Sequence, residues 1–372
     1  MLTLVAGTRP NFMKVAPIWR ALMSRGLAPR IVHTGQHFDA SMSDVFFRDL
    51  GLPEPDSNLR AGGGTQAEQT AAVLVGMERE LVAHRPQALV VVGDVTSTLS
   101  AALAGAKLGV PVVHVEAGLR SGDWTMPEEI NRVLTDHLAD LLLTTTAEAT
   151  LQLLRESADA SRIQFVGNVM IDSLRWGLDR PTDALARHDL APRTYALATL
   201  HRPANVDTTE ALGATLDALA AIASRLPVLF PVHPRTRARA ESTGLAERLR
   251  SIPGLRCVDP LGYGDFITLM ANAKLVATDS GGIQEETTAL GIPCLTLRRG
   301  TERPITVSEG TNLIVGVDVD VIASAVEAIV AGRGKRGRVP EGWDGRAAER
   351  AADALLRLLD GQPPPRTAGP RA

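Results

Sequence analysis

Residues 88–118 read ALVVVGDVTSTLSAALAGAKLGVPVVHVEAG, and this stretch decides the fold class. Two runs rich in Val, 88–92 and 110–115, stand on either side of a helical pattern of Ala and Leu. A strand, a helix and a second strand form a βαβ unit, and strands that are apolar throughout are typical of parallel sheets covered on both faces. The stretch therefore predicts an α/β fold with a parallel sheet.

The same alternation extends outward from this unit over most of the chain. In the first half the expected strands are 2–6, 30–33, 88–92, 110–115, 140–145 and 163–166. In the second half they are 195–200, 228–232, 255–258, 275–278, 294–297 and 312–315. Two such series predict two doubly wound, Rossmann-like domains. The length of 372 residues agrees with this, because single cores stop growing near about 250 residues.

The first domain is expected at 1–168 and the second at 169–361, with a hinge near 167–173. The pattern of 345–359 predicts a last amphipathic helix that can pack back on the first domain. The basic, glycine-rich stretch GRGKRGR at 332–338 predicts an exposed loop. The tail 362–372 contains four prolines and is expected to be disordered.

Composition excludes several classes of partner. The 39 Lys and Arg residues against 42 Asp and Glu leave a net charge of −3, without the positive excess that binds nucleic acid. No apolar run approaches the roughly 20 residues that cross a bilayer, and residues 1–8 lack a basic leader, so we expect a cytoplasmic protein without a membrane partner. The two cysteines, Cys257 and Cys294, stand in apolar segments and predict buried thiols rather than a disulfide.

In open α/β sheets ligands bind beyond the carboxyl ends of the strands, so the polar residues that follow each strand are the candidates. Asp94 and Glu116 each end a nearly all-apolar strand, where a charge is costly unless it is needed or paired. Glu128 and Glu129 follow Pro127, as expected at the start of a helix. Carboxylates that converge in this way suit acid/base chemistry on a sugar. The alternative is a helix cap or an ion pair with a nearby arginine, Arg120 or Arg132.

The segment TDSGGIQEE, 278–286, combines a strand end, two glycines and the start of a helix. Backbone N–H groups at Ser280, Gly281 and Gly282 can therefore face a diphosphate. One turn later, Glu285 or Glu286 can accept hydrogen bonds from a ribose diol. The alternative is an Asp/Ser cap on an ordinary helix.

Cations and histidines also follow strands. GTRPNFMK, 7–14, places Arg9 at a turn and Lys14 one helical turn later, so that both can face an anion. His201 with Arg202, and His233, end strands of the second half and can add positive charge near phosphate, although a lone histidine is more often structural. His114 lies inside an apolar strand and is expected to be a core residue.

Signatures of other cofactors and of metals are missing from the sequence. The loop after residue 7 matches neither GxGxxG nor a P-loop, so a nicotinamide or ATP site has no fingerprint. The remaining histidines form no spaced cluster with Cys or Asp, and no metal site is predicted. The DVD triplet at 318–320 precedes a helical pattern and predicts a helix cap.

Ten motifs occur in order along the chain: GTRPNFMKVAPI, HTGQH, VVGDVTSTL, HVEAGLRSGD, MPEEINR, GNVMIDSL, LHRPAN, PVHP, DSGGIQEE and TERP. With these motifs the chain resembles the non-hydrolysing UDP-N-acetylglucosamine 2-epimerases. The resemblance implies the GT-B type of fold, in which two Rossmann-like domains face each other across a cleft. It also implies a homodimer, a UDP-sugar substrate and no cofactor or metal ion.

The implied reaction inverts C2 of the sugar and converts UDP-GlcNAc to UDP-ManNAc. UDP leaves by elimination, 2-acetamidoglucal stays bound, and UDP adds back while the proton reaches the other face. By position, Asp94, Glu116 and Glu128 match the family's candidate acid/base groups. The other matching residues lie around the diphosphate, the active site and the nucleotide: Arg9, Lys14, His201, Ser280, Gly281, Gly282 and Glu286.

Several positions depart from the family pattern. Asn11 and Ala204 each stand where the family commonly has glutamate, and the stretch 123–127 is about two residues shorter than in many bacterial members. Phe38 and Asp39 replace the end of the QHxQ-like motif of a second, activating UDP-GlcNAc site, so we expect that regulation to be absent.

Four alternatives to the non-hydrolysing epimerase stay open. They are a hydrolytic 2-epimerase, an epimerase of a modified UDP-GlcNAc, a GT-B glycosyltransferase and a non-catalytic nucleotide-sugar sensor. A glycosyltransferase needs only one base and leaves the three strand-end carboxylates unexplained. The departures at Asn11 and Ala204 favour the sensor slightly.

Overall fold

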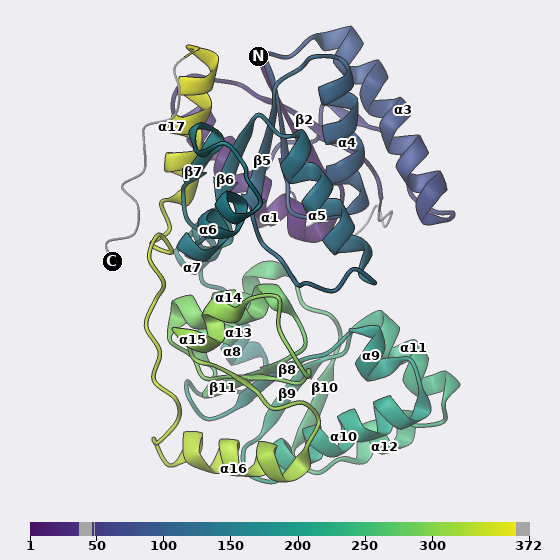
Figure 1. The fold of residues 1–372 in the computed structure, drawn as a ribbon. Helices are drawn as coiled ribbons and strands as arrows, with labels where there is room; N and C mark the ends of the chain where they lie inside the picture. Colours follow the sequence, from purple (N-terminus) through teal and green to yellow (C-terminus); the bar gives the residue numbers. More distant parts are fainter. Residues whose placement is uncertain (37–46, 48, 362–372) are drawn as a thin grey trace. The chain divides into compact units, whose positions relative to one another are not determined.

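The computed structural model describes residues 1–36, 47 and 49–361, and these form two compact units (Figure 1). Unit 1 contains Met1–Trp176 together with the segment that begins at Glu341, and unit 2 contains Gly177–Pro340. The predicted domains, 1–168 and 169–361, differ from these units in where the first one ends and in where the last helix belongs. The tail 362–372 and the residues 37–39 of the second-site motif lie outside the described residues.

Unit 1 is built on a parallel sheet of seven strands in the order β3-β2-β1-β4-β5-β6-β7. The strands are β1 (Leu2–Ala6), β2 (Arg30–His33), β3 (Ser57–Asn58), β4 (Ala88–Val92), β5 (Val112–Ala117), β6 (Leu141–Thr144) and β7 (Ile163–Phe165). Each strand expected in the first half is present, whereas the two-residue β3 was not predicted. The strand order reverses between β1 and β4, which is the position where doubly wound sheets bind ligands.

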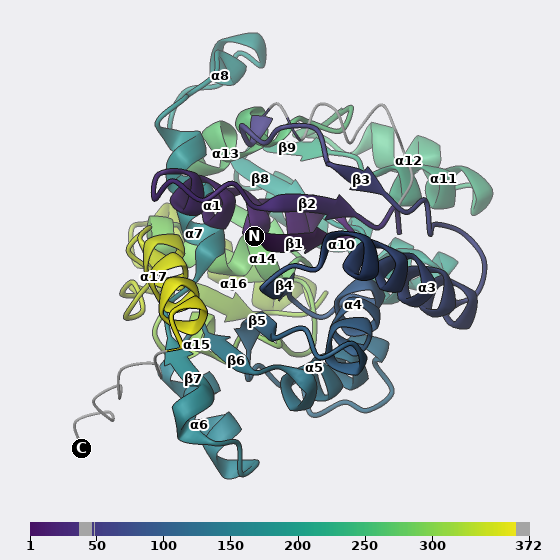
Figure 2. The same ribbon diagram turned by 90° about the horizontal axis from the view of Figure 1, so that it is seen from above.

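Helices cover both faces of the unit 1 sheet. They are α1 (Arg9–Met23), α3 (Gln66–His84), α4 (Thr96–Lys107), α5 (Pro127–Leu138), α6 (Ala147–Arg155), α7 (Val169–Leu178) and α17 (Ala347–Leu359), with a short 3₁₀ turn η1 (Ala160–Arg162). Figure 2 shows α1, α7 and α17 on one side of the sheet and α3, α4 and α5 on the other.

Helices α7 and α17 explain where unit 1 ends. The Ser173 hydroxyl of α7 donates to the Met13 carbonyl of α1 at 2.5 Å. Asp172, also in α7, accepts the first N–H groups of α17, from Ala347 at 3.2 Å and Ala348 at 2.8 Å. The last helix is thereby bound to unit 1, as its amphipathic pattern allowed.

Unit 2 repeats the architecture with six parallel strands in the order β10-β9-β8-β11-β12-β13. The strands are β8 (Ala196–Thr199), β9 (Val228–Pro231), β10 (Leu255–Val258), β11 (Leu275–Thr278), β12 (Cys294–Thr296) and β13 (Asn312–Ile314). The order reverses between β8 and β11, so a second ligand-binding position is expected there.

The helices of unit 2 are α8 (Ala184–Arg187), α9 (Pro203–Val206), α10 (Thr209–Ala223), α11 (Pro234–Ser242), α12 (Ala246–Ser251), α13 (Tyr263–Asn272), α14 (Gly281–Leu290), α15 (Pro304–Ser308) and α16 (Val319–Val330). Asp318 caps α16 by accepting the N–H groups of Asp320 and Val321, both at 3.1 Å. The helix-cap interpretation of the DVD triplet is thus confirmed.

Both cysteines are free thiols in unit 2, Cys294 buried and Cys257 half-buried. Burial raises the pKa of Cys294 to about 12. Within the described ranges, no helix is both long and apolar enough to cross a bilayer, and no group of three His, Cys, Asp or Glu side chains could hold a metal ion.

Candidate active site

A buried ion pair stands where the strand order of unit 1 reverses. Lys14 Nζ, from the second turn of α1, lies 2.5 Å from Glu116 Oε2, and both side chains are almost fully buried. Gly93, directly after β4, has φ +68°, and a Cβ there would lie 2.9 Å from Lys14 Nζ. The glycine therefore lets the end of β4 approach the ammonium group. Sequence reasoning named Lys14 and Glu116 separately, and the structure brings them together.

Glu116 has a backbone conformation that the sequence did not reveal. Its φ is +75°, in the left-handed region that non-glycine residues rarely adopt. The pairing of β5 with β6 shifts register between Val115 and Ala117, which is the signature of a bulge at Glu116. Strained residues of this kind cluster at functional sites because the surrounding structure must hold them.

Two residues in the second turn of α5 hold Asp94. Arg132 forms an ion pair with the Asp94 carboxylate, and Asn131 Nδ2 donates to the Asp94 carbonyl at 2.9 Å. Asp94 thus makes the ion pair with Arg132 that the sequence left open as an alternative, and about a quarter of its side chain stays exposed. Arg132 also contacts Glu129 at 2.7 Å.

The two glutamates at the start of α5 differ in environment. Glu129 is buried and accepts the N–H groups of Ser121 and Gly122 at 2.9 Å, which closes the loop before α5. Burial alone would raise the pKa of Glu129. The hydrogen bonds and the charge of Arg132 outweigh burial, so the pKa is lowered. Glu128 is exposed, and within the described residues no hydrogen bond or ion pair joins its side chain to this network. Its acid/base role stays a prediction.

His114 connects the ends of β4 and β5. It is fully buried, as expected, and its Nδ1 lies 2.6 Å from Asp136 Oδ1 while its Nε2 lies 2.8 Å from the Gly93 carbonyl. Asp136 also accepts the N–H of Gly118 at 3.1 Å and contacts Arg120 at 2.7 Å. Burial opposes the ionised form of Asp136, but its contacts with His114 and Arg120 lower its pKa. The sequence did not identify this network.

Asn11 and Arg9 lie near the end of the first strand, β1. Asn11 Oδ1 accepts the N–H groups of Gly7 and Thr8 at 3.1 Å, and its Nδ2 donates to the Val92 carbonyl at 3.1 Å. A glutamate has no donor for that carbonyl, so asparagine suits this loop. Arg9 begins α1, and its side chain lies outside the part of the chain that the structure describes.

In unit 2, Asp279 organises the loop after β8. It is fully buried and accepts the N–H groups of His201 at 3.0 Å and Arg202 at 2.8 Å, while His201 Nδ1 lies 3.2 Å from its other oxygen. Burial alone would raise the pKa of Asp279, but these bonds outweigh it and lower the pKa. From the sequence, Asp279 is only part of the segment 278–286, for which an Asp/Ser helix cap is the alternative interpretation.

His201 and His233, which the sequence placed at the ends of two strands, lie next to each other in the structure. Their ring centroids are 5.3 Å apart. The His233 Nδ1 accepts the N–H of Arg235 at 3.1 Å, which places the proton of the neutral ring on Nε2. The His201 side chain is 37% exposed, so it is accessible to a ligand.

The first turn of α14 lies beside Glu302. Ser280 is the N-cap residue, but its side chain makes no capping hydrogen bond. A Cβ on Gly281 would lie 2.9 Å from Glu302 Oε1, so a larger residue here would displace the Glu302 carboxylate. Glu302 in turn pairs with Arg202 at 2.9 Å and Arg298 at 2.7 Å. Burial opposes its ionised form, but the charges of Arg303, Arg298 and Arg202 lower the pKa of Glu302 to about 2.

Glu286 is enclosed one turn further along α14. Burial and the neighbouring Glu285 raise the pKa of Glu286 to about 8, although the Tyr263 hydroxyl donates to it at 3.4 Å. Glu285 is paired with Arg303 at 2.9 Å. Of the two glutamates named as ribose ligands, Glu285 is paired with arginine, whereas Glu286 forms no ion pair with an arginine among the described residues.

The family model for UDP-N-acetylglucosamine 2-epimerase matches residues 20–356 of this chain. The chain belongs to this family. A curated UDP-N-acetylglucosamine 2-epimerase from Methanocaldococcus jannaschii is 40% identical over 96% of this chain and 98% of its own length. A UDP-2,3-diacetamido-2,3-dideoxy-D-glucuronate 2-epimerase from Pseudomonas aeruginosa is 41% identical over 96% of this chain and 99% of its own.

Solved structures of family members agree with the fold. The Methanocaldococcus jannaschii UDP-GlcNAc 2-epimerase in complex with UDP-GlcNAc and UDP has a TM-score of 0.87, with 95% of this chain and 99% of that chain covered. The spinosyn rhamnosyltransferase SpnG, 19% identical with a TM-score of 0.52, shares the fold alone. The epimerase family member described here therefore has the GT-B type of fold, as its motifs implied.

Proposed function

We propose that this protein interconverts UDP-GlcNAc and UDP-ManNAc by inversion at C2 without net hydrolysis. Family membership supports the class of reaction. The observation that carries the proposal is the buried Lys14–Glu116 pair at the end of β5, with Glu116 in a backbone conformation that only a constrained site maintains. A carboxylate held in this way next to an ammonium group is suited to proton transfer at a fixed position.

In the proposed reaction, unit 2 binds the UDP moiety. The N–H groups at Ser280, Gly281 and Gly282, together with His201 and Arg202, stabilise the diphosphate, and Glu286 accepts hydrogen bonds from the ribose hydroxyls. Stabilising the departing diphosphate is an electrostatic task for preorganised groups. Arg9 is proposed to add positive charge, and His233 is proposed to donate its Nε2–H to the phosphate. We assign no metal or cofactor to this step.

The proposed chemistry has two balanced halves. A base removes the C2 proton as the bond between C1 and the diphosphate oxygen breaks, which yields 2-acetamidoglucal and UDP. An acid then delivers a proton to the other face of C2 while the diphosphate oxygen adds back to C1. Because each face of C2 needs its own proton carrier, more than one carboxylate is required, and we assign this work to Asp94, Glu116 and Glu128.

Incubation with UDP-GlcNAc in deuterated water, followed by proton NMR, tests the proposal. We expect deuterium at C2 and the appearance of UDP-ManNAc. Accumulation of UDP with free ManNAc would instead indicate a hydrolytic epimerase. Consumption that depends on an acceptor would indicate a transferase, and an unchanged bound spectrum would indicate a sensor.

A modified UDP-GlcNAc is the second candidate substrate. The chain is 41% identical to the diacetamido-glucuronate 2-epimerase and 40% identical to the UDP-GlcNAc enzyme, so sequence identity does not distinguish the two substrates. Comparison of kcat/KM for UDP-GlcNAc and UDP-2,3-diacetamido-2,3-dideoxy-D-glucuronate decides between them. A higher kcat/KM for the glucuronate would replace the first substrate and leave the C2 chemistry as proposed.

A further inference from the structure

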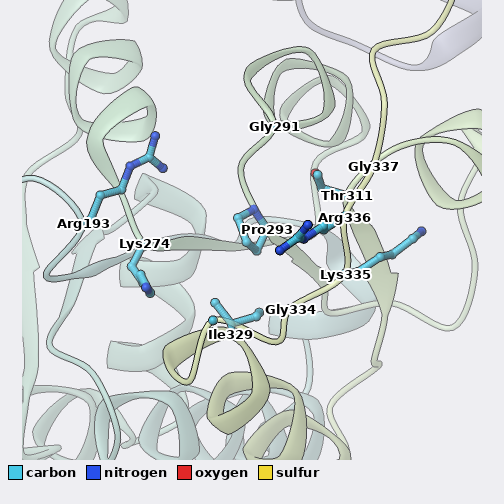
Figure 3. Close-up of a pocket in the computed structure, with 11 residues that line it drawn as sticks. Arg193, Lys274, Gly291, Pro293, Thr311, Ile329, Gly334, Lys335, Arg336 and Gly337 are labelled. Atoms are coloured by element: carbon cyan, nitrogen blue, oxygen red, sulfur yellow. The ribbon is translucent and has the colours of Figure 1, made fainter.

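Unit 2 has a pocket of about 410 Å³ at the amino-terminal ends of its strands. Asp279 and Ser280 lie at the opposite, carboxyl-terminal ends. Its walls come from the residues that precede β8, β11, β12 and β13, namely Arg193, Lys274, Pro293 and Thr311, and from residues 332 and 334–337 of the following loop. Figure 3 shows these residues around one hollow. The pocket thus lies at the amino ends of the strands, away from the strand ends assigned to the UDP-sugar.

The pocket is strongly basic. Four of its lining residues, Arg193, Lys274, Lys335 and Arg336, carry positive charge, and none of the lining residues is acidic. The whole chain has more acidic than basic residues, with a net charge of −3, so composition alone does not explain this cluster. Two of the cations belong to the basic, glycine-rich stretch 332–338 that the sequence predicted as a loop.

Two of the four cations already have partners that explain them structurally. Arg193 Nη1 donates to the Ala273 carbonyl at 2.7 Å, at the end of α13. Lys335 Nζ donates to the Val307 carbonyl and, at 3.0 Å, to the Asn312 carbonyl. Cations at the carbonyl ends of helices are favourable without any ligand.

Lys274 and Arg336 are not explained in this way. Within the residues that the structure describes, neither side chain has a hydrogen-bond or ion-pair partner, although Lys274 is half-buried. In Figure 3 the guanidinium of Arg336 extends over Pro293, toward the side on which Lys274 lies, whereas Lys335 extends the opposite way. These two charges therefore remain available to a ligand in the hollow.

We propose that this pocket binds a small anion that carries several phosphate groups. Ammonium and guanidinium groups are the preferred protein partners of phosphate, and two available charges in a field of four favour an anion of more than one charge. The volume lies within the range of small-molecule sites. The lining contains no aromatic side chain on which a base could stack, so phosphate supplies the recognition.

Titration with inorganic tripolyphosphate at constant ionic strength tests the proposal, because screening then stays the same. We expect the full-length protein to bind at two places, this pocket and the proposed diphosphate site. Amide resonances of Gly332, Gly334 and Gly337 should shift during the titration. In the double variant Lys274→Ala, Arg336→Ala these shifts should vanish or require at least about tenfold more tripolyphosphate, while the KM for the UDP-sugar stays unchanged.

The matched control is the double variant Arg79→Ala, Lys107→Ala. It also removes one lysine and one arginine, both exposed, and neither residue lines the pocket. Glycine shifts equal to those of the unmodified protein are expected. An equal loss of tripolyphosphate binding in this control would overturn the proposal, because general charge would then explain the binding.

Two further results would also overturn it. One is an absence of glycine shifts in the unmodified protein at millimolar tripolyphosphate. The other is binding of a single-stranded oligonucleotide at these glycines without binding of tripolyphosphate. Neither result depends on whether the protein epimerises a UDP-sugar, so failure of this proposal is distinguishable from failure of the proposed function.

Discussion

At the residue scale, His114 connects two strand ends of unit 1. Its two ring nitrogens contact Asp136 and the Gly93 carbonyl, which directly precedes Asp94. Asp136 in turn holds the N–H of Gly118, two residues after Glu116. We therefore regard His114 as a positioning residue for the two strand ends that carry Asp94 and Glu116.

Two substitutions of His114 separate its contacts. A glutamine amide reaches roughly the place of Nε2 and retains the bond to the Gly93 carbonyl, whereas an asparagine amide reaches that of Nδ1 and retains the bond to Asp136. We expect kcat of His114→Asn to fall about tenfold below that of His114→Gln, a barrier difference of ~1.4 kcal/mol. Steady-state kinetics measures this, with UDP affinity as the control. Equal kcat values would show that the Gly93 contact has no positioning role.

At the scale of elements, one buried carboxylate caps α17 and helps to attach it to unit 1. Asp172 of α7 accepts the N–H groups of Ala347 and Ala348, which have no partner inside their own helix. Burial raises the pKa of Asp172 from 3.8 to about 6, although these two N–H groups act in the opposite direction. The two hydrogen bonds therefore stabilise the ionised carboxylate of Asp172, whereas its burial destabilises it.

This raised pKa predicts how stability changes with pH. The native protein binds the proton of Asp172 more tightly than the unfolded chain does. Protonated Asp172 therefore adds to the free energy of unfolding below about pH 4, and this stabilisation is lost as the pH rises through about 6. Two pKa units correspond to about 3 kcal/mol. Asp172→Asn does not titrate, so the wild type should lose about 2 kcal/mol relative to the variant between pH 4.5 and 7.

Urea unfolding of both proteins across this range measures the difference. Asp353→Asn is the control, because Asp353 is a half-exposed acid on α17 that pairs with Arg25. It should show no comparable divergence from the wild type. Parallel stability curves for the wild type and Asp172→Asn would show that the pKa of Asp172 is not raised.

At the scale of the whole molecule, the proposed function divides the work between the units. Unit 1 contributes the acid/base candidates, and unit 2 contributes the candidate UDP ligands around α14. Substitutions in the two units should therefore affect different measurements.

Asp94→Asn or Glu116→Gln is expected to abolish deuterium exchange at C2 and to leave UDP affinity within about tenfold, or ~1.4 kcal/mol. Gly281→Ala should weaken UDP binding at least about tenfold, because the added Cβ would meet Glu302 at 2.9 Å. Exchange measured by NMR and UDP binding measured by calorimetry test both statements. Exchange at the wild-type rate in either unit 1 variant would remove that residue from the catalytic assignment.

Two controls keep these results interpretable. Glu148→Gln changes an exposed acid on α6, and Gly213→Ala adds a methyl group in α10 where the nearest atom would lie 3.7 Å away. Both should behave like the wild type. Circular dichroism of Glu116→Gln is also needed, because removal of one partner of a buried ion pair leaves Lys14 uncompensated.

The sequence by itself determined the two-sheet architecture, the family and the strand-end positions of Asp94, Glu116, His201 and Ser280. These follow from local patterns, because apolar strands, helical periodicity and strand-end polar residues are properties of short stretches of chain. The family follows from the ten ordered motifs for the same reason, because each motif is a contiguous stretch of chain.

Only the tertiary structure decided which side chains meet. The left-handed backbone of Glu116, its pairing with Lys14 and the burial of Glu129 rather than Glu128 all depend on residues far apart in sequence. The role of Asp279, the place of α17 in unit 1 and the basic pocket around Lys274 and Arg336 have the same origin. Periodicity places a residue on an element, but the partner of a buried charge is set by the packing of several elements at once.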